Sequence, residues 1–557
     1  MRLVIDIWRV LIFAAWLLPC LAASFRASDY SGYILAPSTR TLAASSIYRV
    51  RGNVTNVKSL LQSTTVPATI HGPASATLDF GRNVAGIVSI HVGKASKRNT
   101  TLGVTFSESS AYVSSQASDA TQDAGLDKAL LFDVGAGPGT YTASKAHSRG
   151  AFRYLTIVGS AESTIDVEQV TVNFTAAPTH DLAAPYRGYF HCDDELLNRI
   201  WYAGAYTTQL CTIDPSMGSA LNVANLFNSS ASGSVSWWAN TTIANGSSVL
   251  TDGAKRNRVV WPGDMAISLT ATAVSTYDLD SIKNALDALL NGQTPDGRLP
   301  YTTPPLPNPV SFGYHCIGLV SVIRYYIYSG DRQWLTDHWS QFVNGIQWAL
   351  SNIDATGLAN VPDGPDWRSN VSGHVSVCAE SWAACIYANC ICVQNIEGNA
   401  LLYYTLSQAI ILASRTGMAG NLETWSNATK GIQSAANQLL WDAELSLYRN
   451  DETSTLYPQD GNAWAVMGNL TATDSQAKQI TRSLRDRWGQ YGAPAPEAGR
   501  GTISPFVSGL ELQAHYQVGD AGSALDLMRL EWGFMLNDPR MTNSTLIEGY
   551  STNGSLH

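Results

Sequence analysis

The sequence predicts a multidomain β + α protein, in which an N-terminal antiparallel β-sandwich precedes a large helical domain. Three observations predict this fold class. Apolar residues recur with a period of two through roughly the first third of the chain and with a helical period afterwards. The chain has 557 residues, 45% of them hydrophobic, enough to bury the cores of two or more domains. So many consecutive helices form either an α-solenoid or a closed α/α barrel, and periodicity alone does not separate these two.

Residues 1–23 are predicted to be a secretory signal peptide. A mostly apolar run from Val10 to Leu18 precedes a Pro-Cys-Leu-Ala-Ala segment with small residues that suit signal peptidase. The run is shorter than the ~20 apolar residues that a membrane span requires, so a membrane anchor is the weaker alternative. We therefore expect a secreted, extracellular glycoprotein. Its eleven Asn-x-Ser/Thr sequons begin at Asn53, Asn99, Asn173, Asn228, Asn240, Asn245, Asn370, Asn427, Asn469, Asn543 and Asn553.

The charge balance narrows the classes of partner. The net charge of −9 provides no basic field for a polyanion, which argues against nucleic acid and acidic membranes as partners. A neutral substrate fits this balance best. The sequence does not indicate an oligomeric state.

Residues 24–185 are predicted to form the β-sandwich domain. Alternating apolar positions recur in 102–106, 152–154 and 170–174, with Gly and Ser clusters between them. No group of acids, His or Cys in this domain is suited to catalysis. We expect it to pack against the helical domain, with carbohydrate binding as the alternative.

Residues 186–557 are predicted to form the helical domain. Asp193 is a suitable N-cap for a helix containing Leu196, Leu197 and Ile200, and residues 335–350 keep one apolar face through four turns. The sequence has no tetratricopeptide or ankyrin repeat motif, which argues mildly against a solenoid. Further helical patterns occupy residues 281–291, 314–329, 396–413, 421–440, 472–488 and 520–536.

One polar stretch stands out near the middle of the helical domain. Residues 252–264 read Asp-Gly-Ala-Lys-Arg-Asn-Arg-Val-Val-Trp-Pro-Gly-Asp, although only 14% of the whole chain is charged. Pro262 and Gly263 predict a turn, after which Asp264 can cap a helix that begins with Met265. Two carboxylates beside Trp261 suit the wall of a polar site, whereas the simpler alternative is a solvated loop with a helix cap.

This stretch resembles the signature of the α-L-rhamnosidases of glycoside hydrolase family 78, and the resemblance covers nearly everything after the first thirty residues. It implies an (α/α)6 barrel, a six-hairpin toroid, as the catalytic domain of a fungal-type, secreted enzyme. Other segments also resemble the family, namely residues 78–82, 152–155, 186–202, 296–300 and 545–550.

The resemblance also implies an inverting mechanism without a metal or cofactor. Such hydrolysis requires an acid and a base roughly 6.5 to 9.5 Å apart. Glu548 matches the general base, and Asn257 stands where the family has its general acid, although an amide cannot donate a proton at neutral pH. The implied substrate-binding residues in the polar stretch are Asp252, Arg256, Trp261 and Asp264, with the Trp261 ring as a flat surface for the sugar.

Asp366 and Trp367 are further candidates for contacts with rhamnose, because the family places an Asp-Trp pair in its sugar site. The alternative roles are a turn residue and a core anchor. Soon after them, residues 375–394 carry four of the eight cysteines and interrupt a segment that is continuous in the family. Their spacing is not that of a structural zinc site, and we interpret the segment as a retained intron. We also expect the carboxy terminus to be incomplete.

The sequence therefore predicts a glycoside hydrolase that removes terminal α-L-rhamnose from plant glycosides or polysaccharides. Asn257 supports a rival hypothesis, a pseudoenzyme that only binds rhamnosylated glycans. An α/α-toroid polysaccharide lyase is the third alternative, and the acidic balance argues against it because a uronate groove is usually cationic.

Overall fold

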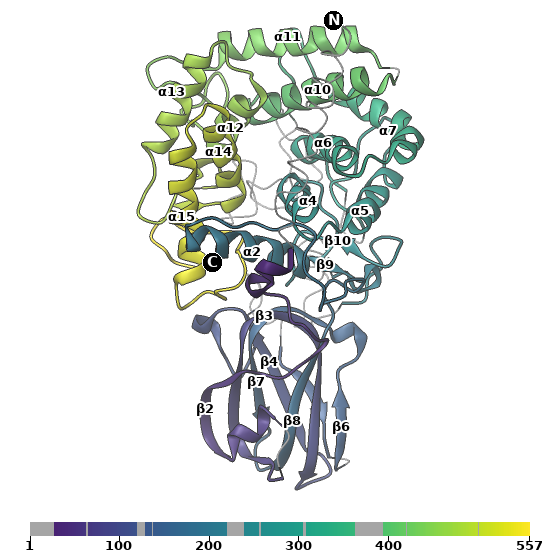
Figure 1. The fold of residues 1–557 in the computed structure, drawn as a ribbon, viewed down its shortest axis with the longest axis vertical. Coiled ribbons are helices and arrows are strands. Elements are labelled where there is room, and N and C mark those ends of the chain that lie inside the picture. Colours follow the sequence, from purple (N-terminus) through teal and green to yellow (C-terminus); the bar gives the residue numbers. More distant parts are fainter. Residues whose placement is uncertain are drawn as a thin grey trace, which may run out of the picture.

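The computed structural model contains a curled β domain and a ring of helices (Figure 1). The β domain carries the purple and blue early residues, and the helices run from teal to yellow above it. The structure describes residues 27–62, 65–119, 128–135, 137–219, 239–255, 258–304, 308–361, 394–418, 420–499 and 501–556.

The β domain is one eight-stranded antiparallel sheet, with strand order β1-β8-β3-β7-β4-β5 and with β2 and β6 also paired to β3. The long strand β3 pairs with β2 and β7 mainly through its first half and with β6 and β8 mainly through its second half. The predicted antiparallel β domain is therefore confirmed, and its two halves share one strand. The strands are β1 Thr41–Leu42, β2 Ser46–Thr55, β3 Ala68–Ala95, β4 Thr101–Ser107, β5 Leu130–Asp133, β6 Gly139–Thr142, β7 Arg149–Gly159 and β8 Thr164–Phe174.

The helices close into a ring, which excludes the α-solenoid alternative. Contacts run in order through α2, α4, α6, α10, α12 and α14, and α15 completes the ring by packing against both α14 and α2. The described helices are α2 Glu195–Leu210, α4 Met265–Val274, α5 Leu279–Asn291, α6 Phe312–Ser329, α7 Arg332–Leu350, α10 Ile396–Thr416, α11 Leu422–Leu439, α12 Gln459–Gly468, α13 Asp474–Arg485, α14 Pro505–Gln517 and α15 Ala521–Asn537.

Short two-stranded ladders tie the loops to the ends of the ring helices. The pairs are β9 Thr212–Ile213 with β10 Val249–Leu250, β11 Trp441–Asp442 with β12 Leu447–Tyr448, and β13 Thr502–Ile503 with β14 Tyr550–Ser551.

Helix α2 begins one residue later than predicted. Asp194, not Asp193, is its N-cap, and the Asp194 side chain accepts hydrogen bonds from the amides of Leu196 and Leu197. Arg529 of α15 donates to the same carboxylate over 2.7 Å. The choice between the two adjacent aspartates therefore depends on a partner more than 300 residues away, which local sequence does not reveal.

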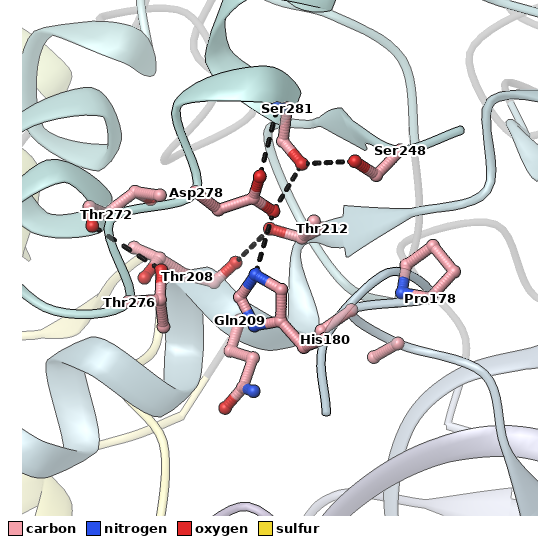
Figure 2. A network of polar contacts seen from close by, with 12 residues as sticks. Pro178, His180, Thr208, Gln209, Thr212, Ser248, Thr272, Thr276, Asp278 and Ser281 are labelled. Carbon is pink, nitrogen blue, oxygen red and sulfur yellow. Dashed lines mark hydrogen bonds and ion pairs between the residues drawn. The ribbon is translucent and has the colours of Figure 1, made fainter. Parts of the chain in front are cut away.

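Side chains from both domains hold the segment that connects β8 to α2. Arg40 donates to the carbonyl oxygens of Ala176, Ala177 and His180. The His180 ring lies 3.1 Å from the Asp278 carboxylate, which also caps α5 by accepting from the Ser281 amide (Figure 2). Burial alone would raise the pKa of Asp278, but hydrogen bonds from His180 and Ser281 hold it below its ordinary value. The predicted boundary at residue 185 lies between β8 and α2.

Two further features concern membrane spans and disulfides among the described residues. No described helix is long and apolar enough to cross a membrane. Within the same part of the chain, Cys192, Cys211 and Cys316 are free thiols, so no disulfide among these three cross-links the helical domain.

Candidate active site

The polar stretch forms a loop between β10 and α4. Asp252 lies two residues after β10, and its backbone amide donates to the Val259 carbonyl oxygen over 3.3 Å. The Val259 amide donates in return to Oδ1 of Asp252 over 3.4 Å. Val260 exchanges hydrogen bonds with Thr303, so the far side of the loop is fixed to the segment before α6. These contacts fix the described part of the loop on both sides.

Asp264 occupies the predicted N-cap position of α4, but its side chain makes no capping hydrogen bond. The prediction that Asp264 caps the helix is therefore wrong for the carboxylate. Its φ of −65° and ψ of −25° are already helical, whereas a capping side chain reaches the first amides from an extended backbone. The carboxylate is consequently free of that structural task.

Glu548 comes from the opposite end of the helical domain. It is exposed, and it lies in the loop between α15 and β14. Because β14 pairs with β13, which directly precedes α14, this loop is held where α14 begins. Asp264 likewise stands where α4 begins. The Asp264 carboxylate therefore lies beside the first turn of α4, and the Glu548 loop lies beside the first turn of α14.

The three carboxylates act on one another electrostatically. Burial, with repulsion from Glu548 as a second cause, raises the pKa of Asp264 to about 7. Burial and repulsion from Asp264 and Glu548 raise the pKa of Asp252 well above its ordinary value, although a hydrogen bond from the Val259 amide opposes the rise. Both aspartates are partly exposed. These interactions place the carboxylates of Asp252, Asp264 and Glu548 near one another.

Trp261 lies beneath the loop rather than on its surface. Only 5% of the residue is exposed, and its ring packs edge-on against Tyr301 and Tyr314 at centroid distances of 4.8 and 6.1 Å. A side chain at Gly263 would approach the Tyr314 ring to 2.2 Å, so this glycine permits the close packing. The expectation that Trp261 offers a broad flat face to the sugar is not supported by this placement.

Arg258 is a residue of the site that sequence reasoning missed. It is 2% exposed, and its Nε and Nη1 atoms have no hydrogen-bond partner among the described residues. Burial lowers the pKa of Arg258 to about 10, against the opposing attraction of Asp252. The sequence places Arg256 and Arg258 in the same stretch but does not show which guanidinium is buried beside Asp252.

Several predicted positions fall outside the described residues. They are Arg256, Asn257, Asp366, Trp367 and nearly all of the insert at 375–394. Within the described ranges, no group of three or more His, Cys, Asp or Glu side chains is arranged to hold a metal ion.

A large part of the helical domain matches a known family. Residues 234–499 match the family described as the bacterial alpha-L-rhamnosidase six-hairpin glycosidase domain. No curated protein matches the chain by sequence.

Solved structures show the same fold at low sequence identity. A rhamnosidase from Klebsiella oxytoca with rhamnose bound is similar at 18% identity and a TM-score of 0.66, over 95% of this chain and 93% of that one. A family 78 rhamnosidase of a Bacillus species gives 18% and 0.67, over 90% of this chain and 46% of that one. The Streptomyces avermitilis α-L-rhamnosidase complexed with L-rhamnose gives 15% and 0.56, over 94% and 42%. The chain thus spans nearly all of the first structure and less than half of the other two.

Proposed function

Because residues 234–499 match the α-L-rhamnosidase six-hairpin glycosidase family, we propose that this protein removes terminal α-L-rhamnose from plant glycosides or polysaccharides by inverting hydrolysis. The observation that carries the proposal is the meeting of Asp252, Asp264 and Glu548 from two distant loops. Glycoside hydrolysis requires one carboxyl group that keeps its proton and one that has lost it. The proposed setting is extracellular, on the evidence of the signal peptide expected at residues 1–23.

Glu548 is proposed as the general base. Its exposed position allows a water molecule to stand beside it. The water oxygen forms a bond to the anomeric carbon of rhamnose while Glu548 accepts the water proton. The bond between that carbon and the glycosidic oxygen breaks, and the oxygen leaves with a proton from the acid. The first product is rhamnose with an inverted anomeric configuration.

Asp264 is the proposed source of the second proton. Asn257 cannot supply one. A carboxyl group with a pKa of about 7, in contrast, is still half protonated at pH 7. An acid whose pKa lies near the working pH is suited to general-acid catalysis. Asp252, whose pKa is also raised, can share this role through a water molecule.

Asn257 favours one second candidate, a pseudoenzyme that binds rhamnosylated glycans without cleaving them. In the family, the position of Asn257 carries the residue that protonates the leaving group. Loss of such help typically lowers the rate by about 10² to 10⁴. Binding without turnover would then remain.

One set of incubations tests these proposals. The purified protein is given an aryl α-L-rhamnoside, a natural plant rhamnoside and rhamnogalacturonan, and proton NMR follows free rhamnose, its first anomer and any unsaturated product. Inverted rhamnose that disappears in Glu548→Gln supports the enzyme. Rhamnose binding by calorimetry with no product from any substrate supports the pseudoenzyme, and rhamnose released first with retained configuration refutes the inverting mechanism.

A further inference from the structure

Contacts with the β domain hold both of the loops that carry the carboxylates. On one side, Nζ of Lys255 lies 3.0 Å from Oε2 of Glu108, and a carboxylate oxygen of Asp119 lies 3.8 Å from the same nitrogen. Lys255 belongs to the loop of Asp252, whereas Glu108 and Asp119 belong to the β domain. Burial alone would lower the pKa of Lys255, but the charges of Asp119 and Glu108 raise it above its usual value, so the ammonium is retained.

The loop of Glu548 is held by the same domain. The Asn83 side-chain nitrogen donates to Thr545 Oγ1 over 3.0 Å, and the Asn83 backbone amide donates to Ser544 Oγ over 2.9 Å. Arg153 donates to the carbonyl oxygen of Thr542 over 3.2 Å. Asn83 is 2% exposed, so these bonds are shielded from water.

Glu108 joins the two sets of contacts. Its Oε1 accepts a hydrogen bond of 2.8 Å from the Asn83 side chain, while its Oε2 pairs with Lys255. Each carboxylate oxygen therefore serves one loop. The fit is tight at the backbone as well, because a Cβ added to Gly150 of β7 would lie 1.6 Å from the Ala254 carbonyl oxygen.

We infer that the β domain sets the spacing between the Asp252 loop and the Glu548 loop, with Glu108 as the positioning residue that links Lys255 to Asn83. Only the catalytic consequence rests on the proposed function. Acid and base must stand at a fixed separation across the scissile bond, and a displacement of about 1 Å can lower the rate by about 10². The β domain is then a structural part of the catalytic apparatus, although it supplies no reacting group.

Hydrogen exchange tests the linkage without requiring activity. The amides to follow are those of Asp252 and Val259 in one loop and of Thr545 and Leu546 in the other, each of which donates to a described acceptor. Glu108→Ala is expected to accelerate exchange in both loops by about tenfold or more, since local opening follows the loss of tethering contacts. Lys255→Met removes the ammonium that pairs with Glu108, and it is also expected to accelerate exchange in both loops.

Two control variants separate linkage from general destabilisation. Glu168→Ala makes the same change at an exposed glutamate of β8. Arg40→Met removes the hydrogen bonds to the interdomain carbonyls and lowers stability without touching either loop. Neither control should change exchange in the two loops. If Glu108→Ala and Lys255→Met loosen only the Lys255 side, or neither loop, the inference is overturned.

Kinetics then distinguish this inference from the proposed function. With an aryl α-L-rhamnoside, Glu108→Ala should lower kcat by about 10- to 100-fold and change KM by less than about threefold. If the unaltered protein hydrolyses no rhamnoside but both loops loosen together, the proposed function fails and the linkage stands. If the protein is active and Glu108→Ala leaves kcat unchanged, the positioning role fails while the proposed function stands.

Discussion

Replacing Asp264 with asparagine should make the protein more stable at alkaline pH while it removes the proposed proton donor. Burial and the charge of Glu548 raise the pKa of this carboxyl from 3.8 to about 7 in the folded protein. The folded state therefore binds the proton more tightly than the unfolded chain does. The stability that this adds is fully present below about pH 4 and is lost as the pH rises through about 7.

The magnitude follows from the size of the rise in pKa. Each pKa unit corresponds to about 1.4 kcal/mol, so ionising Asp264 costs the folded protein about 4 kcal/mol in all. Of this, about 2 to 3 kcal/mol falls between pH 5 and pH 8. Asparagine stays neutral at both values. The free energy of unfolding of Asp264→Asn, relative to that of the unaltered protein, should therefore increase by about 2 to 3 kcal/mol from pH 5 to pH 8.

Urea denaturation at pH 5 and pH 8 measures this difference directly. Asp538→Asn is the matched control, because hydrogen bonds from Arg540 hold the pKa of Asp538 below its ordinary value. That group is ionised in both states at both pH values, so its replacement should have the same effect at pH 5 and pH 8. If Asp264→Asn also changes the free energy of unfolding by the same amount at pH 5 and pH 8, the reasoning is refuted. Asp264 could not then donate a proton near neutral pH.

Three further predictions concern the base, the acid position and the domain contact. Glu548→Gln should lower hydrolysis of an aryl α-L-rhamnoside by at least about 10²; a smaller loss, measured by release of the phenol, would reassign the base. Once Asp264→Asn has removed the proposed donor, adding Asn257→Asp should speed cleavage of natural rhamnosides by about 10² to 10⁴ and change aryl rhamnosides little, because a phenolate leaves unaided; equal gains on both would argue against an acid at this position. Gly150→Ala should lower Tm by several degrees through the clash with Ala254, and an unchanged melting curve would contradict the close contact.

Much of the fold could be predicted because most elements have a clear periodicity. The apolar stripe in 335–350 corresponds to α7, and the alternation in 152–154 and 170–174 corresponds to β7 and β8. Helices α12 and α14 were missed. Nearly every residue of α12 is buried, including the polar Gln459, Asp460 and Asn462, so it has no solvated face and no stripe. The choice between a solenoid and a ring likewise depends on contacts between distant helices.

Candidate site residues could be chosen from the sequence, but the geometry around them could not be predicted. The resemblance identified Asp252, Asp264 and Glu548, and the structure brings them together. It could not show that Asp264 leaves its helix uncapped or that Arg258 is buried. Those properties depend on packing around the loop. The role of Glu108 had no local signal at all, because its partners lie in a different strand and a different domain.

The contact between Asn83 and Thr545 has a consequence for the order of events during synthesis. The two residues are 462 positions apart, so at about 5 to 20 residues per second a ribosome takes roughly 20 to 90 s to make the second after the first. The β domain can fold early. For most of that time, however, its surface around Asn83 and Arg153 lacks its partner, the segment that contains Thr542 and Thr545. Contacts between such distant positions form slowly and leave apolar surface open meanwhile. A nascent chain stalled before residue 542 should therefore hold a folded β domain, bind chaperones and lack a competent site.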